Sequence, residues 1–127
     1  MKYWLLLFFI CSFFQTKLSA QQACPIIPQP LKAASVSQAF TLNKNTPVTI
    51  SHDSLTDVAL YLQQQLLIQN HIPLTLQDQA HAPSIRLSIS KGKKKEEAYT
   101  LEMNSKTIEI SGETIKGVFY GVISFLQ

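Results

Sequence analysis

The chain is poor in cysteine, tryptophan and glycine, and it carries little charge of either sign. Its 127 residues include two cysteines, one tryptophan and four glycines, and charged residues make up 15%. Two cysteines cannot build the disulfide framework that holds many small secreted folds together. A formal net charge of +3 provides no basic surface of the kind that binds nucleic acid. The length allows one domain of ordinary size and excludes an enzyme built on a large barrel.

The first 20 residues have the pattern of a secretory signal peptide. Lys2 precedes an apolar run over residues 3–14, and Leu18-Ser19-Ala20 closes the segment. The run is shorter than the roughly 20 apolar residues that a membrane-spanning helix needs, so a stable membrane anchor is not expected. We expect cleavage after Ala20 and a periplasmic or secreted mature protein.

Cleavage there would remove Cys11 and leave Cys24 as the only thiol. A residue so close to the new terminus is poorly placed to meet a histidine in a pocket, so a catalytic thiol is not expected. The alternative, a lipoprotein acylated at Cys24, is disfavoured because the preceding Gln21-Gln22-Ala23 lacks the apolar residue of such processing sites.

The mature chain is expected to begin with a proline-rich lead-in over residues 21–37, followed by one folded domain over residues 38–127. Pro25, Pro28 and Pro30 keep the lead-in extended. Short strands are predicted over residues 40–42 and 47–50, joined as a hairpin by the turn residues Asn43-Lys44-Asn45.

A helix is predicted next, because apolar residues recur at helical spacing. Ser54, three residues before Asp57, resembles a capping box, and the helix should end near Asn70 because Pro73 lies just beyond. The residues of the predicted apolar stripe are Leu55, Val58, Ala59, Leu62 and Leu66.

The pattern then changes to the alternation typical of strands, over residues 72–76, 85–89, 99–103 and 108–110. Helical spacing returns over residues 114–127. The order of elements predicts an α+β domain in which two helices pack on a sheet of about six strands. Because the connections are short, we expect the sheet to be mostly antiparallel.

No catalytic, cofactor-binding or metal-binding residue is predicted. His52, His71 and His81 lack the spacing of metal ligands. The acidic residues fall in turns, caps and polar strand faces, so no pair of carboxyl groups is placed in a pocket. The lysine cluster over residues 91–95 has no interleaved aromatic residues and is interpreted as a solvated loop.

One pattern is more specific. The strand Glu97-Ala98-Tyr99-Thr100-Leu101 is followed by the strand Ile108-Glu109-Ile110-Ser111-Gly112 and then by Gly117-Val118-Phe119-Tyr120-Gly121. With Ile27-Pro28-Gln29-Pro30 at the start of the mature chain, residues 26–127 resemble the N-terminal domain of secreted bacterial β-N-acetylhexosaminidases of glycoside hydrolase family 20.

The resemblance implies a small zincin-like domain that binds no metal and precedes a catalytic (β/α)8 barrel. In the family, an adjacent Asp-Glu pair of that barrel works with the acetamido group of the substrate. No residue of this chain matches that pair, because the sequence stops where the barrel should start. The resemblance therefore implies a non-catalytic accessory domain of a truncated or split enzyme, whose partner is the missing barrel. The alternative is an independent secreted module that binds a glycan or a protein.

The last predicted helix is apolar on nearly all sides, and a sheet can cover only one of them. We therefore expect this helix to expose an apolar patch that a following domain would bury. Gly117 and Gly121 have a second interpretation, because small residues one turn apart let a helix approach another backbone closely. The residues proposed for the interdomain contact are Gly117, Phe119, Tyr120, Gly121 and Phe125.

Overall fold

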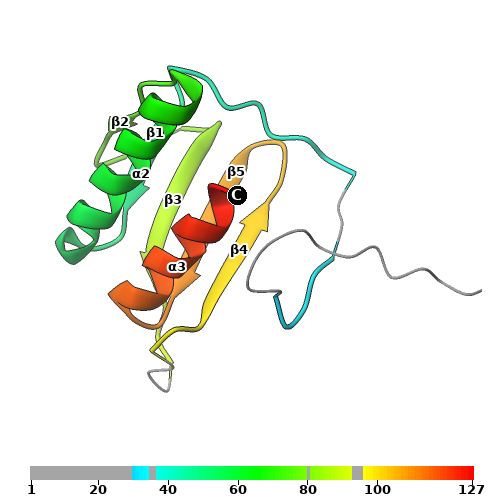
Figure 1. Cartoon of the computed structure of the whole chain (residues 1–127), viewed down its shortest axis with the longest axis vertical. Helices are drawn as coiled ribbons and strands as arrows, with labels where there is room; N and C mark the ends of the chain where they lie inside the picture. The colour runs from blue at the N-terminus through cyan, green and yellow to red at the C-terminus, as the bar shows by residue number, and fades with distance from the viewer. Residues whose placement is uncertain (1–29, 35–36, 80, 93–95) are drawn as a thin grey trace, which may run out of the picture.

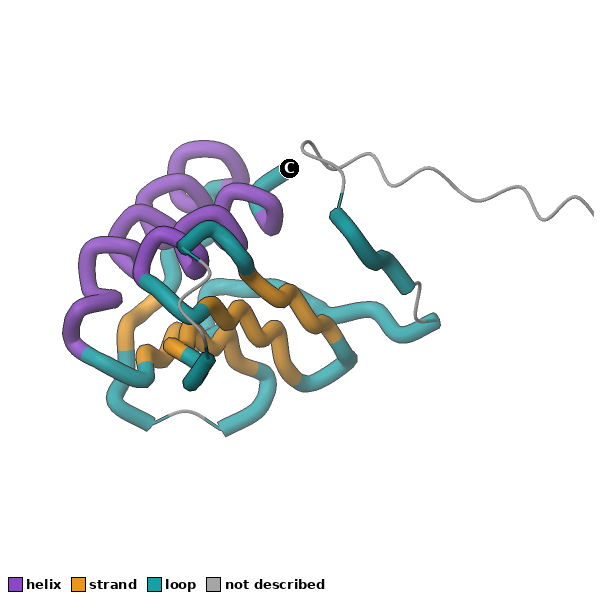
Figure 2. Tube along the Cα trace, turned by 90° about the horizontal axis from the view of Figure 1, so that it is seen from below, coloured by secondary structure: helices purple, strands orange, loops and turns teal. Residues whose placement is uncertain are grey.

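The computed structural model describes residues 30–34, 37–79, 81–92 and 96–127. These residues form one sheet with two helices on the same side of it (Figures 1 and 2). The predicted leader, Cys24 and the first part of the lead-in lie outside the described residues. No helix in the described part of the chain has the length and hydropathy needed to span a membrane.

The order of the elements confirms the predicted α+β class. The helix predicted to end near Asn70 ends at that residue, and the strand predicted over residues 99–103 has those bounds. The elements are β1 (Pro47–Ile50), the 3-10 turn η2 (Asp53–Leu55), α2 (Thr56–Asn70), β2 (Thr75–Leu76), β3 (Ser84–Ile89), β4 (Tyr99–Met103), β5 (Thr107–Gly112) and α3 (Ile115–Phe125).

The sheet differs from the prediction in strand number and in strand direction. It has five strands in the order β2-β1-β3-β5-β4, not about six. The pairs β1–β2, β1–β3 and β3–β5 are parallel, and only β4–β5 is antiparallel. The expectation of a mostly antiparallel sheet was therefore wrong.

Two connections explain the parallel pairs. The 15 residues of α2 span about 22 Å, which returns the chain to the starting end of β1 before β2 begins. The connection after β3 carries the chain past the neighbouring position to the outer strand β4, and the turn at Asn104 then brings β5 back between β3 and β4. Short connections therefore did not join sheet neighbours, except at the β4–β5 hairpin.

The strand predicted over residues 40–42 is absent. Phe40 and Leu42 are half-buried and pack against the core without joining the sheet. The turn residues that follow are held by hydrogen bonds between Asn43 and Thr46. They lead into β1, whose two sides are already paired with β2 and β3. No free edge of β1 remains for the predicted hairpin.

The core lies between the helices and one face of the sheet. Strand alternation sends Ile85 and Leu87 of β3 to this face and Arg86 to the other. The opposite face of the sheet is polar, and Thr49, Arg86 and Glu109 lie side by side across it. The buried apolar residues of the core are Val48, Leu55, Val58, Ala59, Leu62, Leu66, Leu74, Ile85, Leu87, Ile108, Ile110, Val118 and Val122.

Histidines cap the turn η2 that precedes α2 and the C-terminal end of α2 itself. Ser54 does not cap the helix as predicted; instead, Nδ1 of His52 accepts a hydrogen bond from the Ser54 N–H at 3.1 Å. At the other end His71 has φ of 58° and ψ of 31°, in the left-handed region. Its N–H donates to the Leu67 carbonyl at 3.1 Å and closes the last turn.

Glycine should be more favourable than histidine at position 71, because a side chain is disfavoured at positive φ. We expect His71→Gly to raise the free energy of unfolding by about 0.5–1 kcal/mol, measured by urea denaturation. His71→Ala keeps a Cβ in the same conformation and should bring no such gain. Equal stability of the two variants would contradict this account of the helix end.

Candidate interdomain surface

The five residues proposed for an interdomain contact lie on different sides of α3. Gly117 and Gly121 are buried against the sheet of the chain itself. A Cβ at Gly117 would overlap the Ala98 carbonyl oxygen, and one at Gly121 would lie 2.5 Å from Cγ2 of Ile110. Both glycines therefore serve close packing within the domain and are covered there.

Phe119 packs α3 against α2. Its ring lies 5.3 Å from the ring of Tyr61, measured between centroids, with an interplanar angle of 57°. Phe119 and Phe125 are half-buried, and Tyr120 is exposed on the outer side of the helix. Phe119, Tyr120 and Phe125 therefore keep apolar surface that a second domain could reach.

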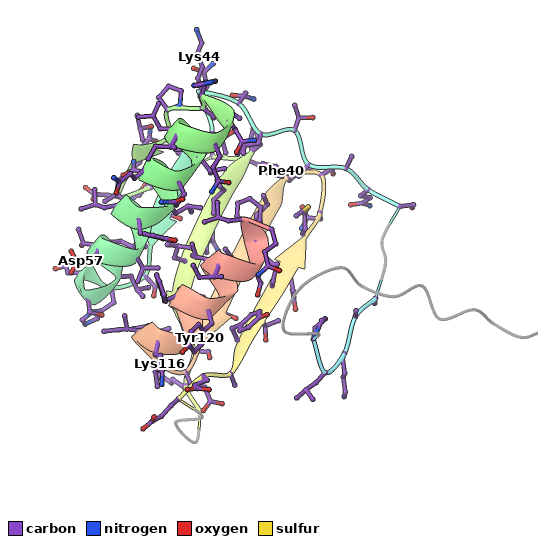
Figure 3. The ribbon with its side chains drawn as sticks, in the orientation of Figure 1. Phe40, Lys44, Asp57, Lys116 and Tyr120 are labelled. Atoms are coloured by element: carbon purple, nitrogen blue, oxygen red, sulfur yellow. The ribbon has the colours of Figure 1, made fainter. Side chains whose placement is uncertain are left out.

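The start of α3 is attached to the segment before β4. The Thr114 hydroxyl accepts a hydrogen bond from the Gly117 N–H at 3.1 Å and donates one to the Glu96 carbonyl. Lys116 bonds to the Glu97 carboxylate at 2.6 Å and lies 5.9 Å from the centre of the Tyr120 ring (Figure 3). The hydrogen bond to Glu97, together with the negative charge of that group, raises the pKa of the Lys116 ammonium above its ordinary value. The ion pair is exposed, so it orients the side chains and adds little stability.

The outer side of α2 carries apolar residues that the sequence interpretation missed. The exposed fractions are 51% for Leu60, 49% for Leu67 and 61% for Ile68. The sequence interpretation followed only the buried stripe and treated the rest of the helix as polar. The absence of a dominant apolar side in α2 is the signal that could have revealed them, because leucine and isoleucine occur all round the helix.

The two helices form the side of the molecule that faces away from the sheet (Figure 2), and both carry exposed apolar side chains. Large exposed apolar patches mark interaction sites in soluble proteins. These side chains can therefore contact an apolar partner, but they include no group suited to catalysis. We call them the helix-layer surface, which consists of Leu60, Leu67 and Ile68 of α2 with Ile115, Phe119 and Tyr120 of α3.

The groups that could supply chemistry are dispersed. His52 lies before η2, His71 follows the other end of α2, and His81 lies in the connection between β2 and β3. Among the described residues, no cluster of three or more His, Cys, Asp or Glu side chains could hold a metal ion. The lysine cluster predicted as a solvated loop falls largely on residues 93–95, which lie outside the described residues.

A shallow hollow of about 380 Å³ lies beside the end of β1. It is lined by Thr49, Ile50, Ser51, Asp78, Gln79 and Arg86. Most of the lining residues are of polar types, and most of their side chains are exposed. Ligand pockets are usually deeper and more apolar, so this hollow is a weaker candidate than the helix-layer surface.

Comparison with known proteins identifies the family to which the sequence is similar. Residues 23–127 match the family model described as glycosyl hydrolase family 20, domain 2. A β-hexosaminidase of Porphyromonas gingivalis is 25% identical over 105 residues, which are 80% of this chain and 14% of the relative.

Solved structures show the same fold. An N-acetyl-β-hexosaminidase of Streptomyces plicatus matches with a TM-score of 0.72 and 22% identity over 80% of this chain and 20% of its own. An exo-β-N-acetylglucosaminidase of Vibrio harveyi matches with a TM-score of 0.71 and 21% identity over 82% of this chain and 16% of its own. The chain thus spans a fifth or less of each of these three relatives.

The close packing at the α3 glycines can be tested by comparing an alanine substitution there with one at a glycine outside the helix. Alanine favours a helix by about 1 kcal/mol over glycine, yet we expect Gly117→Ala to lower the free energy of unfolding by about 1–3 kcal/mol, because its Cβ would overlap backbone. In Gly92→Ala the three atoms nearest to the Cβ all belong to the Glu113 side chain and none to the backbone, so a smaller loss of stability than in Gly117→Ala is expected. A stabilised Gly117→Ala variant in thermal or urea unfolding would contradict the close packing.

Proposed function

The chain belongs to glycosyl hydrolase family 20 as its domain 2, and we propose that it serves a secreted β-N-acetylhexosaminidase by docking its helix-layer surface onto the catalytic domain. In the family-level resemblance, this domain is the non-catalytic one and a barrel hydrolyses terminal N-acetylhexosamine. The observation that carries the proposal is the position of the exposed apolar side chains on the outside of the helices, where nothing within the described chain covers them.

The proportions of the relatives support a partner within a longer protein. The matched region is 14% of the Porphyromonas gingivalis β-hexosaminidase and 20% of the Streptomyces plicatus enzyme. Most of each relative therefore lies outside the part that resembles this chain. The partner that we propose for the helix-layer surface is the catalytic barrel within that remainder.

The alternative of an independent glycan-binding module gains no specific support. Sugar-binding surfaces use exposed aromatic rings as platforms. The described aromatic residues lie on the helix side of the sheet, where Tyr61 and Phe119 pack together and Phe40 lies against the core. On the opposite face, the described strand residues include Thr49, Arg86 and Glu109 and no aromatic ring.

The docking proposal predicts the behaviour of residues 21–127 on their own. The uncovered surface should bind a hydrophobic dye, and the chain should associate as its concentration rises. Replacing Leu60, Leu67 and Ile68 together with glutamine should lower dye fluorescence by at least half. These side chains are about half exposed, so unfolding stability should change little at each site.

Leu31→Gln provides the matched control, because Leu31 is an exposed apolar residue of the lead-in and belongs to neither helix. Its dye binding should equal that of the unchanged chain. If the chain stays monomeric and binds no dye at high concentration, the apolar side chains of the helices are covered by the chain itself. That result would favour the independent module instead.

Secretion is proposed from the leader alone. When the chain is expressed with its leader in a bacterium, we expect the periplasmic or secreted product to begin at Gln21, which N-terminal sequencing or intact mass would show. Ala20→Arg should block this cleavage, because small residues are required there. A soluble product that still begins at Met1 would overturn the assignment.

A further inference from the structure

The longer free edge of the described sheet is strand β4. In the order β2-β1-β3-β5-β4, the outer strands are β2 and β4 (Figure 1). The edge at β2 is only two residues long, whereas β4 presents five residues. No described segment pairs with the outer side of β4, and residues 30–34, which Figure 1 draws on that side, form no strand.

The hairpin register shows which backbone groups of β4 point outward. The Asn104 N–H donates to the Thr107 carbonyl at 3.0 Å, which makes these two residues a hydrogen-bonded pair. The register continues through β4 without a bulge. Because hydrogen-bonded pairs alternate along an antiparallel ladder, Thr100 and Glu102 bond to β5. The residues whose N–H and C=O groups point away from β5 are Tyr99, Leu101 and Met103.

This edge lacks the usual protection against pairing. Natural edge strands are kept short, bulged, or interrupted by proline or lysine. β4 contains no proline and no lysine, and its one charged residue, Glu102, lies on the polar face of the sheet. Met103, on the helix side, is 39% exposed. The edge thus combines outward backbone groups with exposed apolar surface.

We propose that this edge pairs with the same edge of a second copy of the chain, antiparallel and around a two-fold axis at Leu101. The axis opposes Leu101 to Leu101 of the other copy, and Tyr99 to Met103. All three outward residues of each copy then form hydrogen-bonded pairs, and the two sheets become one. The contact shares no residue with the helix-layer surface, so it does not depend on the docking proposed above.

The side chains favour this register over its neighbours. In an antiparallel pair, opposed side chains share a face, and like charges directly opposite are destabilising. A two-fold axis at Glu102 would oppose the two Glu102 carboxylates. An axis at Thr100 would oppose the apolar Met103 to the charged Glu97. The axis at Leu101 instead opposes Glu102 to Thr100 on the polar face and gathers apolar side chains on the helix side.

Charges beyond the strand agree with the same register. When the register is continued past Met103, it opposes Lys106 of one copy to Glu96 of the other, and both residues are exposed. A two-fold axis repeats this pair of opposite charges at both ends of the strand. Exposed pairs add little affinity, but they favour this orientation. The match exists only with a strand of the same sequence, which is why the occupant is a second copy.

A background without native thiols and with a polar helix layer makes the register testable. In the full chain, Cys11→Ser and Cys24→Ser remove the two native cysteines. Replacing Leu60, Leu67 and Ile68 with glutamine prevents the helix-layer surface from causing dimers. Dimers that form in this background therefore need another contact.

A cysteine at the axis should form a disulfide between two copies. Hydrogen-bonded pairs have Cα atoms about 5.5 Å apart, within the range of about 4.4–6.8 Å that a disulfide spans. Mild oxidation should therefore give covalent dimers of Leu101→Cys about ten times faster than of Met103→Cys, whose two copies lie on opposite sides of the axis. Chance collisions would favour Met103→Cys, because Met103 is the more exposed residue.

Non-reducing electrophoresis and intact mass measure the dimer in both variants. Equal rates of bridging, or faster bridging of Met103→Cys, would overturn the proposal.

Amide hydrogen exchange provides a second test that introduces no thiol. In the same background, exchange at Tyr99, Leu101 and Met103 should slow about tenfold as the protein concentration rises from micromolar to millimolar. The amides of Thr100 and Glu102 bond to β5 and should not change. Fast exchange at every concentration would show an unpaired edge, and slow exchange at every concentration would show that the chain itself covers the edge. Either result would contradict pairing between copies.

Discussion

The close approach of α3 to the sheet is the constraint on which the rest of the domain depends. At Gly117 the helix backbone lies against the Ala98 carbonyl, and at Gly121 it lies against Ile110 and Tyr99. The Tyr99 and Ser124 hydroxyls share a hydrogen bond of 2.6 Å that joins the outer strand to the last turn of the helix. Because the helix lies this close, Val118 and Val122 reach the core and are fully buried.

This packing also determines which surfaces remain. The contact between Tyr61 and Phe119 joins the two helices into one layer, and that layer covers the buried apolar residues of the sheet. Leu60, Leu67 and Ile68 stay exposed on the outside of this layer. The polar side chains of the opposite face, among them Arg86 and Glu109, are suited to water. Exposed leucine and isoleucine are unusual on the solvent side of a helix, which is why we propose a partner on the helix side.

The sequence predicted the local elements more successfully than their arrangement. Periodicity located α2, α3 and the strands at residues 85–89 and 99–103, because burial on one face imposes a repeat on each segment separately. Whether a strand pair is parallel or antiparallel depends on which strands become neighbours. No local pattern in the sequences of β3 and β5 predicts that these two strands are adjacent. For the candidate surface, the sequence predicted that α3 is apolar on nearly all sides. The exposed apolar residues of α2 were missed, because glutamines 63–65 suggested a polar side. Whether Gly117 and Gly121 face the sheet or a partner depends on the position of Ala98, which only the structure provides.

The contact that we propose for the helix-layer surface depends on whether its two sides belong to one chain. Burying one large apolar side chain contributes about 1.5–3 kcal/mol, and free association of two proteins costs at least about 4 kcal/mol in lost translational and rotational freedom. The handful of exposed side chains on α2 and α3 would leave a modest surplus for separate molecules. In the relatives, the corresponding region is 14–20% of one continuous chain, so the contact that we propose would form within one molecule at high effective concentration. On the proposed function, the modest surplus from this apolar surface would be enough to hold the domain against a covalently linked neighbour.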